Sequence, residues 1–333
     1  MKIRSVYLIE PGRVELRERE ISVGPRDVLV RGFQASICGT DKMFFQGQRP
    51  PPNPVAKGKG FAERHTGFPL PLGHEGGGEV IEVGGEVREF APGDWVMVLG
   101  WHNVMGDYWV APDAGVLKIP DGISPEVGAL GEPLSCAMYA GLQSGVELGD
   151  WVAVVGMGFA GQVIAQVAKG KGAHRVIAVD VVPEKLALAE SLGADRCIHS
   201  GEEDPVEQIM RWTDKRGVDV VIEAAGSEQA VNTASAILRS GGILGIYSWI
   251  VDPVRLNVSR WHDDGFDIRT LALMHRVGPD RRWWLQRSLV PVAQGMVRVE
   301  PLITHRFPLD QVSHAFEAAV KDPTACKVAL TIP

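Results

Sequence analysis

A glycine-rich turn between two apolar runs is the feature that most constrains how this chain can fold. The run 152–155 is typical of a short buried strand, and Gly156, Gly158 and Gly161 follow it at G-x-G-x-x-G spacing. A stripe of apolar residues at helical spacing comes next, and a second apolar run, 176–179, is followed directly by an aspartate, Asp180. This order predicts a strand, a turn, a helix and a second, parallel strand.

Each glycine has its own role in such a unit. Gly156 permits the tight turn from strand to helix, Gly158 lets the backbone approach a pyrophosphate, and Gly161 lets the helix pack closely on the strand. We expect Phe159 and Ala160, which lie between these glycines, to contact the dinucleotide as well. The pattern therefore predicts a dinucleotide-binding unit.

The aspartate at the end of the second strand predicts which dinucleotide binds. An acidic side chain at this place accepts hydrogen bonds from the adenosine ribose hydroxyls and repels a 2′-phosphate. Asp180 occupies that position, so we expect NAD rather than NADP.

The bulk composition excludes several classes of protein. The 333 residues suffice for two domains, and 45% hydrophobic with 23% charged residues is typical of a globular protein. A net charge of −7 argues against nucleic-acid or anionic membrane partners. No run resembles a membrane span or a signal-peptide core, and the 4 cysteines are scattered. We therefore expect a cytoplasmic protein without a disulfide framework.

The pattern of strand-like and helix-like runs changes twice along the chain. The first hundred residues alternate short β-type runs with glycine and proline, which favours a small barrel or sandwich. From about residue 124 a helix-like stretch leads into the strand–helix alternation of a parallel sheet, and β-type runs return beyond about 270. The sequence thus predicts an α/β protein whose domains span residues 1–125, 126–270 and 271–333, the last part returning to the first domain.

Cys38, His74 and Glu75 are candidates for a metal site. Thiolate, imidazole and carboxylate are all good zinc ligands. Spacing alone does not require them to meet, because Cys38 and His74 are both expected in loops. From the residues alone, a buried thiol is the more ordinary interpretation of Cys38, and a hydrogen-bonded loop histidine that of His74.

A series of motifs gives these candidates a context. In order along the chain they are Cys-Gly-Thr-Asp at 38–41, Gly-His-Glu at 73–75, Gly-Asp-x-Val at 93–96, Glu-Pro-Leu-Ser at 132–135, the glycine motif, and Ile-Glu-Ala-Ala-Gly at 222–226. The series resembles the zinc-dependent medium-chain alcohol dehydrogenases, in the branch of the sorbitol and threonine dehydrogenases. The resemblance implies a GroES-like catalytic domain built from both ends of the chain, with a Rossmann domain between them.

The resemblance also implies roles for individual residues. Cys38 and His74 become ligands of a catalytic zinc, and Glu75 and Glu132 become further ligands or acids close to it. Thr40 would accept the proton of the substrate alcohol, and Asp41 would support the histidine ligand. On the cofactor side, Lys185 and Ala225 join the residues expected to contact NAD.

Two departures from the family pattern are visible. Relatives often carry a histidine two residues after the aspartate of the first motif, where this chain has Met43. Methionine cannot relay a proton, so we expect water or another group such as His65 to take it. The cysteine-rich lobe of many relatives is also missing after Gly-Asp-x-Val, so we expect one catalytic zinc and no structural zinc.

Together these observations predict a zinc- and NAD-dependent dehydrogenase that oxidises a secondary alcohol of a polyol, cyclitol, sugar or amino alcohol. The partners would be a small alcohol or ketone and further copies of the chain, as a homodimer or homotetramer. A ketone or aldehyde reductase working in reverse is the alternative within the superfamily. A non-catalytic NAD-binding structural protein is the alternative of another class.

Overall fold

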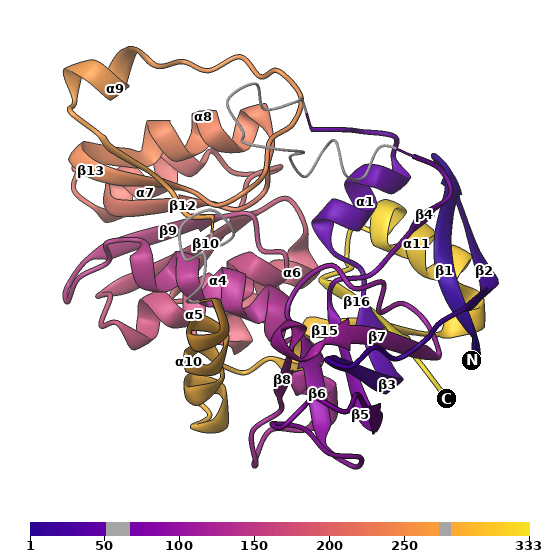
Figure 1. Ribbon diagram of the computed structural model, residues 1–333. Helices are drawn as coiled ribbons and strands as arrows, with labels where there is room; N and C mark the ends of the chain where they lie inside the picture. Colours follow the sequence, from indigo (N-terminus) through magenta and orange to yellow (C-terminus); the bar gives the residue numbers. More distant parts are fainter. Residues whose placement is uncertain (51–66, 273–280) are drawn as a thin grey trace. The chain divides into compact units, whose positions relative to one another are not determined.

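The computed structural model describes residues 1–50, 67–272 and 281–333, and Figure 1 shows its helices and strands. They form two compact units. The first unit comprises Met1–Pro133 and Ile303–Pro333, and the second comprises Leu134–Leu302. Both ends of the chain therefore belong to the same unit.

The first unit is built mainly of β-structure. A three-stranded sheet has the order β2-β1-β4, and a seven-stranded sheet has the order β15-β16-β3-β5-β6-β8 with β7 paired to β3. Its strands are β1 (Lys2–Glu10), β2 (Arg13–Glu20), β3 (Asp27–Ser36), β4 (Leu70–Pro71), β5 (Gly76–Val83), β6 (Trp95–Val98), β7 (Tyr108–Pro112), β8 (Val116–Lys118), β15 (Ile303–Pro308) and β16 (Lys327–Thr331). Its helices are α1 (Gly39–Phe45), α3 (Pro125–Gly128) and α11 (Val312–Lys321), with short 3-10 turns η1 (Asp113–Gly115) and η4 (Leu309–Gln311).

The last strand of the chain completes this sheet. β16 runs antiparallel to β3, with Ala329 opposite Ser36, and β3 pairs in turn with β5, with Ala35 opposite Gly76. In Figure 1 the yellow β16 lies beside the indigo β3. The first residues of β16 and β5 therefore lie at the same end of the sheet as the last residues of β3.

The second unit contains a six-stranded parallel sheet in the order β11-β10-β9-β12-β13-β14. Its strands are β9 (Trp151–Val155), β10 (Arg175–Asp180), β11 (Arg196–His199), β12 (Val218–Glu223), β13 (Leu238–Ile246) and β14 (Asp267–Thr270). Its helices are α4 (Gly131–Gln143, from Leu134 onward), α5 (Phe159–Gly170), α6 (Pro183–Ser191), α7 (Pro205–Trp212), α8 (Glu228–Ile237), α9 (Ser259–Asp263) and α10 (Arg281–Ala293), followed by the 3-10 turn η3 (Glu300–Leu302).

This strand order is that of a doubly wound dinucleotide fold. Numbered along the chain, the strands stand in the order 3-2-1-4-5-6, and the direction of winding reverses between β9 and β12. Strands with helices on both faces are apolar throughout, and Val152, Ala153 and Val154 of β9 are accordingly all fully buried. The strands expected over 152–155 and 176–179 are present. Strand β9 begins one residue earlier than expected, and β10 extends one residue further at each end.

The boundaries between the two units differ from those that the pattern of the sequence indicated. We expected boundaries near 125 and 270, whereas the units change between 133 and 134 and between 302 and 303. Helix α10 stays with the second unit because Trp284 packs edge-on against Tyr139, with ring centroids 4.9 Å apart. The side chain of Gln166 also bonds both the N–H and the carbonyl of Arg298.

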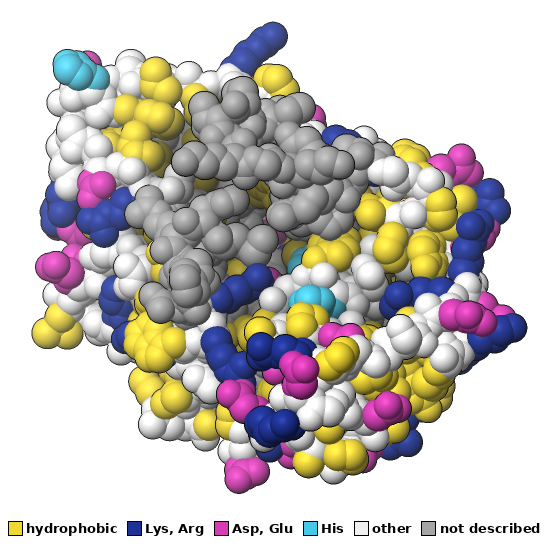
Figure 2. Space-filling view, in the orientation of Figure 1, with side chains coloured by type: hydrophobic (Ala, Val, Ile, Leu, Met, Phe, Trp, Pro, Cys, Tyr) yellow, Lys and Arg dark blue, Asp and Glu magenta, His cyan; other side chains and the backbone are white. Residues whose placement is uncertain are grey.

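The face of the protein in Figure 2 carries charges of both signs. Lys and Arg side chains are interspersed there with Asp and Glu rather than gathered in one patch. This mixing limits the repulsion between like charges on that face.

The packing of α5 on β9 makes a prediction about stability. A Cβ at Gly161 would overlap the carbonyl oxygen of Gly156, whereas a Cβ at Gly158 would meet nothing within 4 Å. Gly161→Ala should therefore lower the free energy of unfolding by about 1–3 kcal/mol, through forced displacement of α5. Chemical denaturation followed by circular dichroism measures this change.

Gly158→Ala is the matched control, because it adds the same methyl group three residues earlier in the same motif. Its stability should stay within about 1 kcal/mol of wild type. Equal stability of the two variants would show that α5 and β9 are not packed as closely as described.

Candidate metal and cofactor sites

Two strand ends bring the candidate metal ligands together. Cys38 lies two residues beyond the end of β3, and His74 and Glu75 immediately precede β5. The N–H of Ser36 donates to the carbonyl of Glu75 (3.0 Å), which fixes the two segments side by side. The pairing of β3 with β5 therefore forces residues far apart in the sequence into one place.

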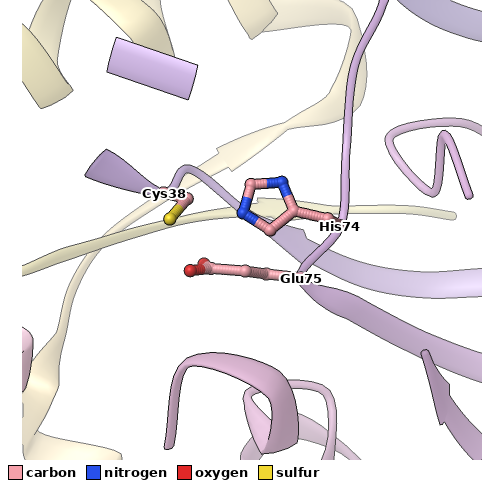
Figure 3. A group of neighbouring side chains, drawn as sticks. All are labelled: Cys38, His74 and Glu75. Atoms are coloured by element: carbon pink, nitrogen blue, oxygen red, sulfur yellow. The ribbon is translucent and has the colours of Figure 1, made fainter. Parts of the chain in front are cut away.

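The side chains of Cys38, His74 and Glu75 converge (Figure 3). One potential ligand atom from each lies within 4.8 Å of the others. His74 and Glu75 are buried and Cys38 is partly buried. A sulfur, a nitrogen and an oxygen at this separation form a donor set that suits zinc.

Several atoms around this group are buried without a hydrogen-bond partner. They are Glu75 Oε1, His74 Nδ1 and Asp41 Oδ1. Buried polar atoms are nearly always satisfied in folded proteins, so such a cluster calls for an explanation. Binding of a metal ion would satisfy the carboxylate oxygen, and the residues present therefore fit a zinc ion.

Asp41 lies where a carboxylate can support the histidine ligand. Its Oδ1 is 3.7 Å from Nδ1 of His74, and its Oδ2 accepts the backbone N–H of Cys38 at 2.9 Å. Burial raises the pKa of Asp41 to about 6, although the charge of His74 opposes that shift. With Nδ1 facing Asp41, Nε2 of the imidazole is left to bind a metal.

The electrostatic surroundings of Cys38 disfavour a free thiolate. Burial, and then the negative charge of Glu75, raise the pKa of the Cys38 thiol well above its usual value. A zinc ligand must be deprotonated, so binding of the ion would release this proton. The thiol is therefore poised to respond to a metal rather than to react as a nucleophile.

Glu132 is close to this group without being part of it. It is buried near the start of α4, and its charge also contributes to the raised pKa of Cys38. It does not belong to the group of atoms within 4.8 Å of one another. Direct ligation by Glu132 stays a prediction.

Trp101 is a neighbour of the metal group. Its ring stacks on the imidazole of His74, with centroids 4.7 Å apart and planes 14° apart. Its Nε1 donates to the carbonyl of Pro71 at 3.3 Å. Trp101 thus holds one face of His74 and restricts the orientation of the imidazole.

The proton route is only partly described. Thr40 Oγ1 lies 3.9 Å from Cys38 Sγ, so its hydroxyl is next to the metal group. Met43 is buried, with 6% of its surface exposed. His65, the alternative proton carrier expected from the sequence, lies outside the described residues.

The glycine motif has the geometry that each of its glycines was expected to provide. Gly156 has a φ of +97°, and a Cβ there would come within 2.6 Å of the backbone nitrogen of Ala225. Gly158 is the N-cap of α5 and faces open space, so a phosphate can approach its backbone. Phe159 and Ala160 form the first turn of α5, which places the motif at the carboxyl end of β9.

Asp180 lies beside this motif. Its Oδ2 accepts the N–H of Met157 at 2.6 Å and its Oδ1 accepts the N–H of Val182 at 3.0 Å. Each carboxylate oxygen can accept a second hydrogen bond, so the side chain can still receive ribose hydroxyls. Lys185 lies on α6, and its carbonyl accepts a hydrogen bond from Gln162 of α5 at 2.8 Å.

The turn after β12 faces the glycine motif across the switch point. The buried carboxylate of Glu223 accepts the N–H groups of Ala225 (2.8 Å) and Gly226 (2.6 Å) and the hydroxyl of Ser248. Glu223 thereby fixes Ala225, the residue expected to contact the cofactor. In open α/β sheets ligands bind at this crevice, and the supporting role of Glu223 was not foreseen from the sequence.

Two further residues at the metal group were also not foreseen. Lys327 donates to Oε2 of Glu75 at 2.8 Å, and the hydroxyl of Ser36 donates to the same oxygen. A lysine at the start of a strand carries no signal in the sequence that it will be buried. Only the pairing of β16 with β3 brings it to the site.

Comparison with known proteins assigns the chain to a family. The model of the alcohol dehydrogenase GroES-like domain matches residues 24–121, and that of the zinc-binding dehydrogenase domain matches residues 160–281. The chain is 32% identical to sorbitol dehydrogenase of Mus musculus over 348 aligned positions, covering 95% of this chain and 92% of that protein.

Solved structures share the fold of this chain. The 2R,3R-butanediol dehydrogenase of Bacillus subtilis matches with a TM-score of 0.85 at 24% identity, over 99% of this chain and 100% of that chain. A zinc-binding dehydrogenase of Sinorhizobium meliloti 1021, solved with NADP bound, matches with a TM-score of 0.83 at 25% identity over 99% of both chains. The predicted combination of a GroES-like and a Rossmann domain is confirmed.

Among the described residues, no helix has both the length and the apolar character needed to cross a bilayer.

The matches cover nearly the whole chain, and the described ligand group fits the metal of the matched family. The chain belongs to the zinc-dependent medium-chain alcohol dehydrogenases, a family of oxidoreductases, in the branch that contains the sorbitol dehydrogenases.

Proposed function

We propose that this protein is an NAD-dependent polyol dehydrogenase, which oxidises a secondary alcohol of a polyol, cyclitol, sugar or amino alcohol to a ketone. The observation that carries the proposal is the convergence of Cys38, His74 and Glu75, with unsatisfied buried atoms around them. The identity to a sorbitol dehydrogenase over most of both chains supports a polyol as the class of substrate.

The reaction divides into two transfers. The carbinol carbon loses a hydride and its hydroxyl loses a proton, so that alcohol and NAD become ketone and NADH with release of one proton. When bound, zinc would supply a Lewis acid for the alcohol oxygen, and NAD would supply the hydride acceptor.

The residues of the chain have separate parts in this chemistry. Cys38 and His74 would hold the metal. Trp101 and Asp41 contact the imidazole of His74 and would orient it. The hydroxyl of Thr40, next to Cys38, would take the proton of the substrate. Gly158 and Asp180 bind the pyrophosphate and the adenosine ribose of NAD. Because Met43 cannot carry a proton, ordered water or another group takes it from Thr40.

The proposal is tested with purified protein and a panel of polyols, inositols and amino alcohols, by following NADH absorbance. We expect turnover of at least one of them and about one zinc per chain. Cys38→Ser should abolish turnover and zinc binding but leave NADH binding intact, because Cys38 and the glycine motif belong to different units. Elemental analysis and NADH fluorescence measure these quantities.

Two results would contradict this assignment. Two tightly bound zinc ions per chain would mean that a second site exists which the cysteine pattern does not provide. Loss of NADH binding together with zinc in Cys38→Ser, in a protein that is still folded, would mean that the site is misassigned.

Asp180 makes a prediction about cofactor preference. Two unit charges 4 Å apart repel by about 1 kcal/mol in water, so the carboxylate should disfavour a 2′-phosphate severalfold or more. Asp180→Asn removes the charge but keeps an oxygen to accept the N–H of Met157. The ratio of kcat/KM for NAD to that for NADP should fall by a similar factor.

The conservative Asp180→Glu variant, which retains the charge, is the control and should still favour NAD. A wild-type protein with the higher kcat/KM for NADP would overturn the assignment of Asp180 to the ribose. The NADP found in one structural relative makes this comparison informative.

Thr40 makes a prediction about proton transfer. General acid–base steps contribute about 10²–10⁴-fold to rate, so Thr40→Val should lower kcat within that range while zinc and NADH stay bound. Thr40→Ser, which keeps a hydroxyl, should retain most of the activity. Full activity of Thr40→Val in steady-state assays would remove this residue from the proton route.

A further inference from the structure

A buried ion pair lies directly behind the metal group. Nζ of Lys327 is 2.8 Å from Oε2 of Glu75, and the side chains are 6% and 1% exposed. Two charges are rarely buried in this way unless the pair is well bonded, because removing them from water costs several kcal/mol each. The family motifs quoted above contain Glu75 but not Lys327.

The two oxygens of Glu75 have different surroundings. Oε2 accepts hydrogen bonds from both Lys327 and the hydroxyl of Ser36, whereas Oε1 is buried with no hydrogen-bond partner. One oxygen is therefore fixed by the sheet and the other is left free. A carboxylate held in this way can offer one oxygen to a metal but cannot rotate to offer both.

Lys327 also opposes the negative charges that surround Cys38. Glu75, Asp41 and Glu132 all act on Cys38 as negative charges, and Lys327 is the positive charge that opposes them. Burial alone would raise the pKa of Glu75 and lower the pKa of Lys327. The charge of each residue opposes the effect of burial on the other, so that the pKa of Glu75 is lowered and the pKa of Lys327 is raised.

We propose that Lys327, assisted by Ser36, is a positioning residue that restricts Glu75 to presenting a single oxygen, Oε1, to the zinc site. The inference rests on the proposed zinc site and adds a residue from the far end of the chain to it. A fixed single-oxygen contact leaves room at the metal for the substrate. A carboxylate free to bind with both oxygens would occupy that room.

Cobalt substitution tests this inference directly. Co²⁺ replaces zinc, and its visible d–d absorption weakens as the coordination number rises from four. We expect Lys327→Met to bind one Co²⁺ per chain with a weaker visible absorption than wild type, because Glu75 then uses both oxygens. Lys327→Arg, which keeps a cation that can donate two hydrogen bonds, should restore most of the wild-type spectrum.

Activity should change in parallel. Residues that hold metal ligands typically contribute about 10–100-fold to metal affinity or activity, so kcat/KM of Lys327→Met should fall by about that factor with zinc still bound. Lys118→Met is the matched control. It breaks an exposed lysine–carboxylate pair in the same unit, 2.7 Å from Asp94, and should alter neither spectrum nor activity.

Ser36→Ala provides a second variant if Lys327→Met does not fold, since it removes only one of the two hydrogen bonds to Oε2. Its cobalt spectrum should shift in the same direction by a smaller amount. A double-mutant cycle then asks whether Lys327 acts through Glu75. In a Glu75→Gln background, the effect of Lys327→Met on the spectrum should fall to less than half.

The outcomes separate this inference from the proposed function. Wild-type protein that binds neither zinc nor Co²⁺ contradicts the zinc site itself. Co²⁺ spectra of Lys327→Met and Ser36→Ala that superimpose on that of wild type overturn the role of Lys327, even if the enzyme is a dehydrogenase. An undiminished effect in the Glu75→Gln background overturns it too.

Discussion

The antiparallel pairing of β3 with both β5 and β16 is the arrangement on which the metal group and its neighbouring ion pair depend. It joins the end of the chain to a strand near its beginning, with Ala329 opposite Ser36, and β3 carries the register on to β5. Lys327, Ser36 and Glu75 come from three adjacent strands or the residues next to them. A slip of one residue in either pairing would turn these side chains to the other face of the sheet. The site is thus specified by strand register rather than by any local motif.

The cofactor unit shows the opposite relation between sequence and structure. Its features were predicted because they are local: the glycines, α5 and Asp180 follow one another within a single β-α-β unit, and each glycine has a steric reason that one residue type satisfies. Gly156 needs its positive φ, and Gly161 has no room for a Cβ. Glu223 was missed, because its role depends on the loops after two neighbouring strands meeting.

The metal group lies between these extremes. Cys38, His74 and Glu75 were predicted from their chemical type and from the resemblance to a family, and the structure brings all three together. The residues that hold them could not be predicted. Trp101 stacks on His74 only because of how two loops fold, and Lys327 is separated from Glu75 by 252 positions in the chain. Long-range contacts of this kind leave no periodicity or spacing to recognise.

Buried atoms without a hydrogen-bond partner connect the stability of the first unit with the chemistry of its metal group. A buried polar group without a partner costs about 1–3 kcal/mol, and Glu75 Oε1 and Asp41 Oδ1 are both in this condition beside the Cys38 thiol. The fold compensates on one side of Glu75 only, through Lys327 and Ser36. An ion that binds on the other side relieves an existing penalty, so its binding free energy is partly stability of the fold. The strand register that builds the site therefore also creates the demand for a cation there.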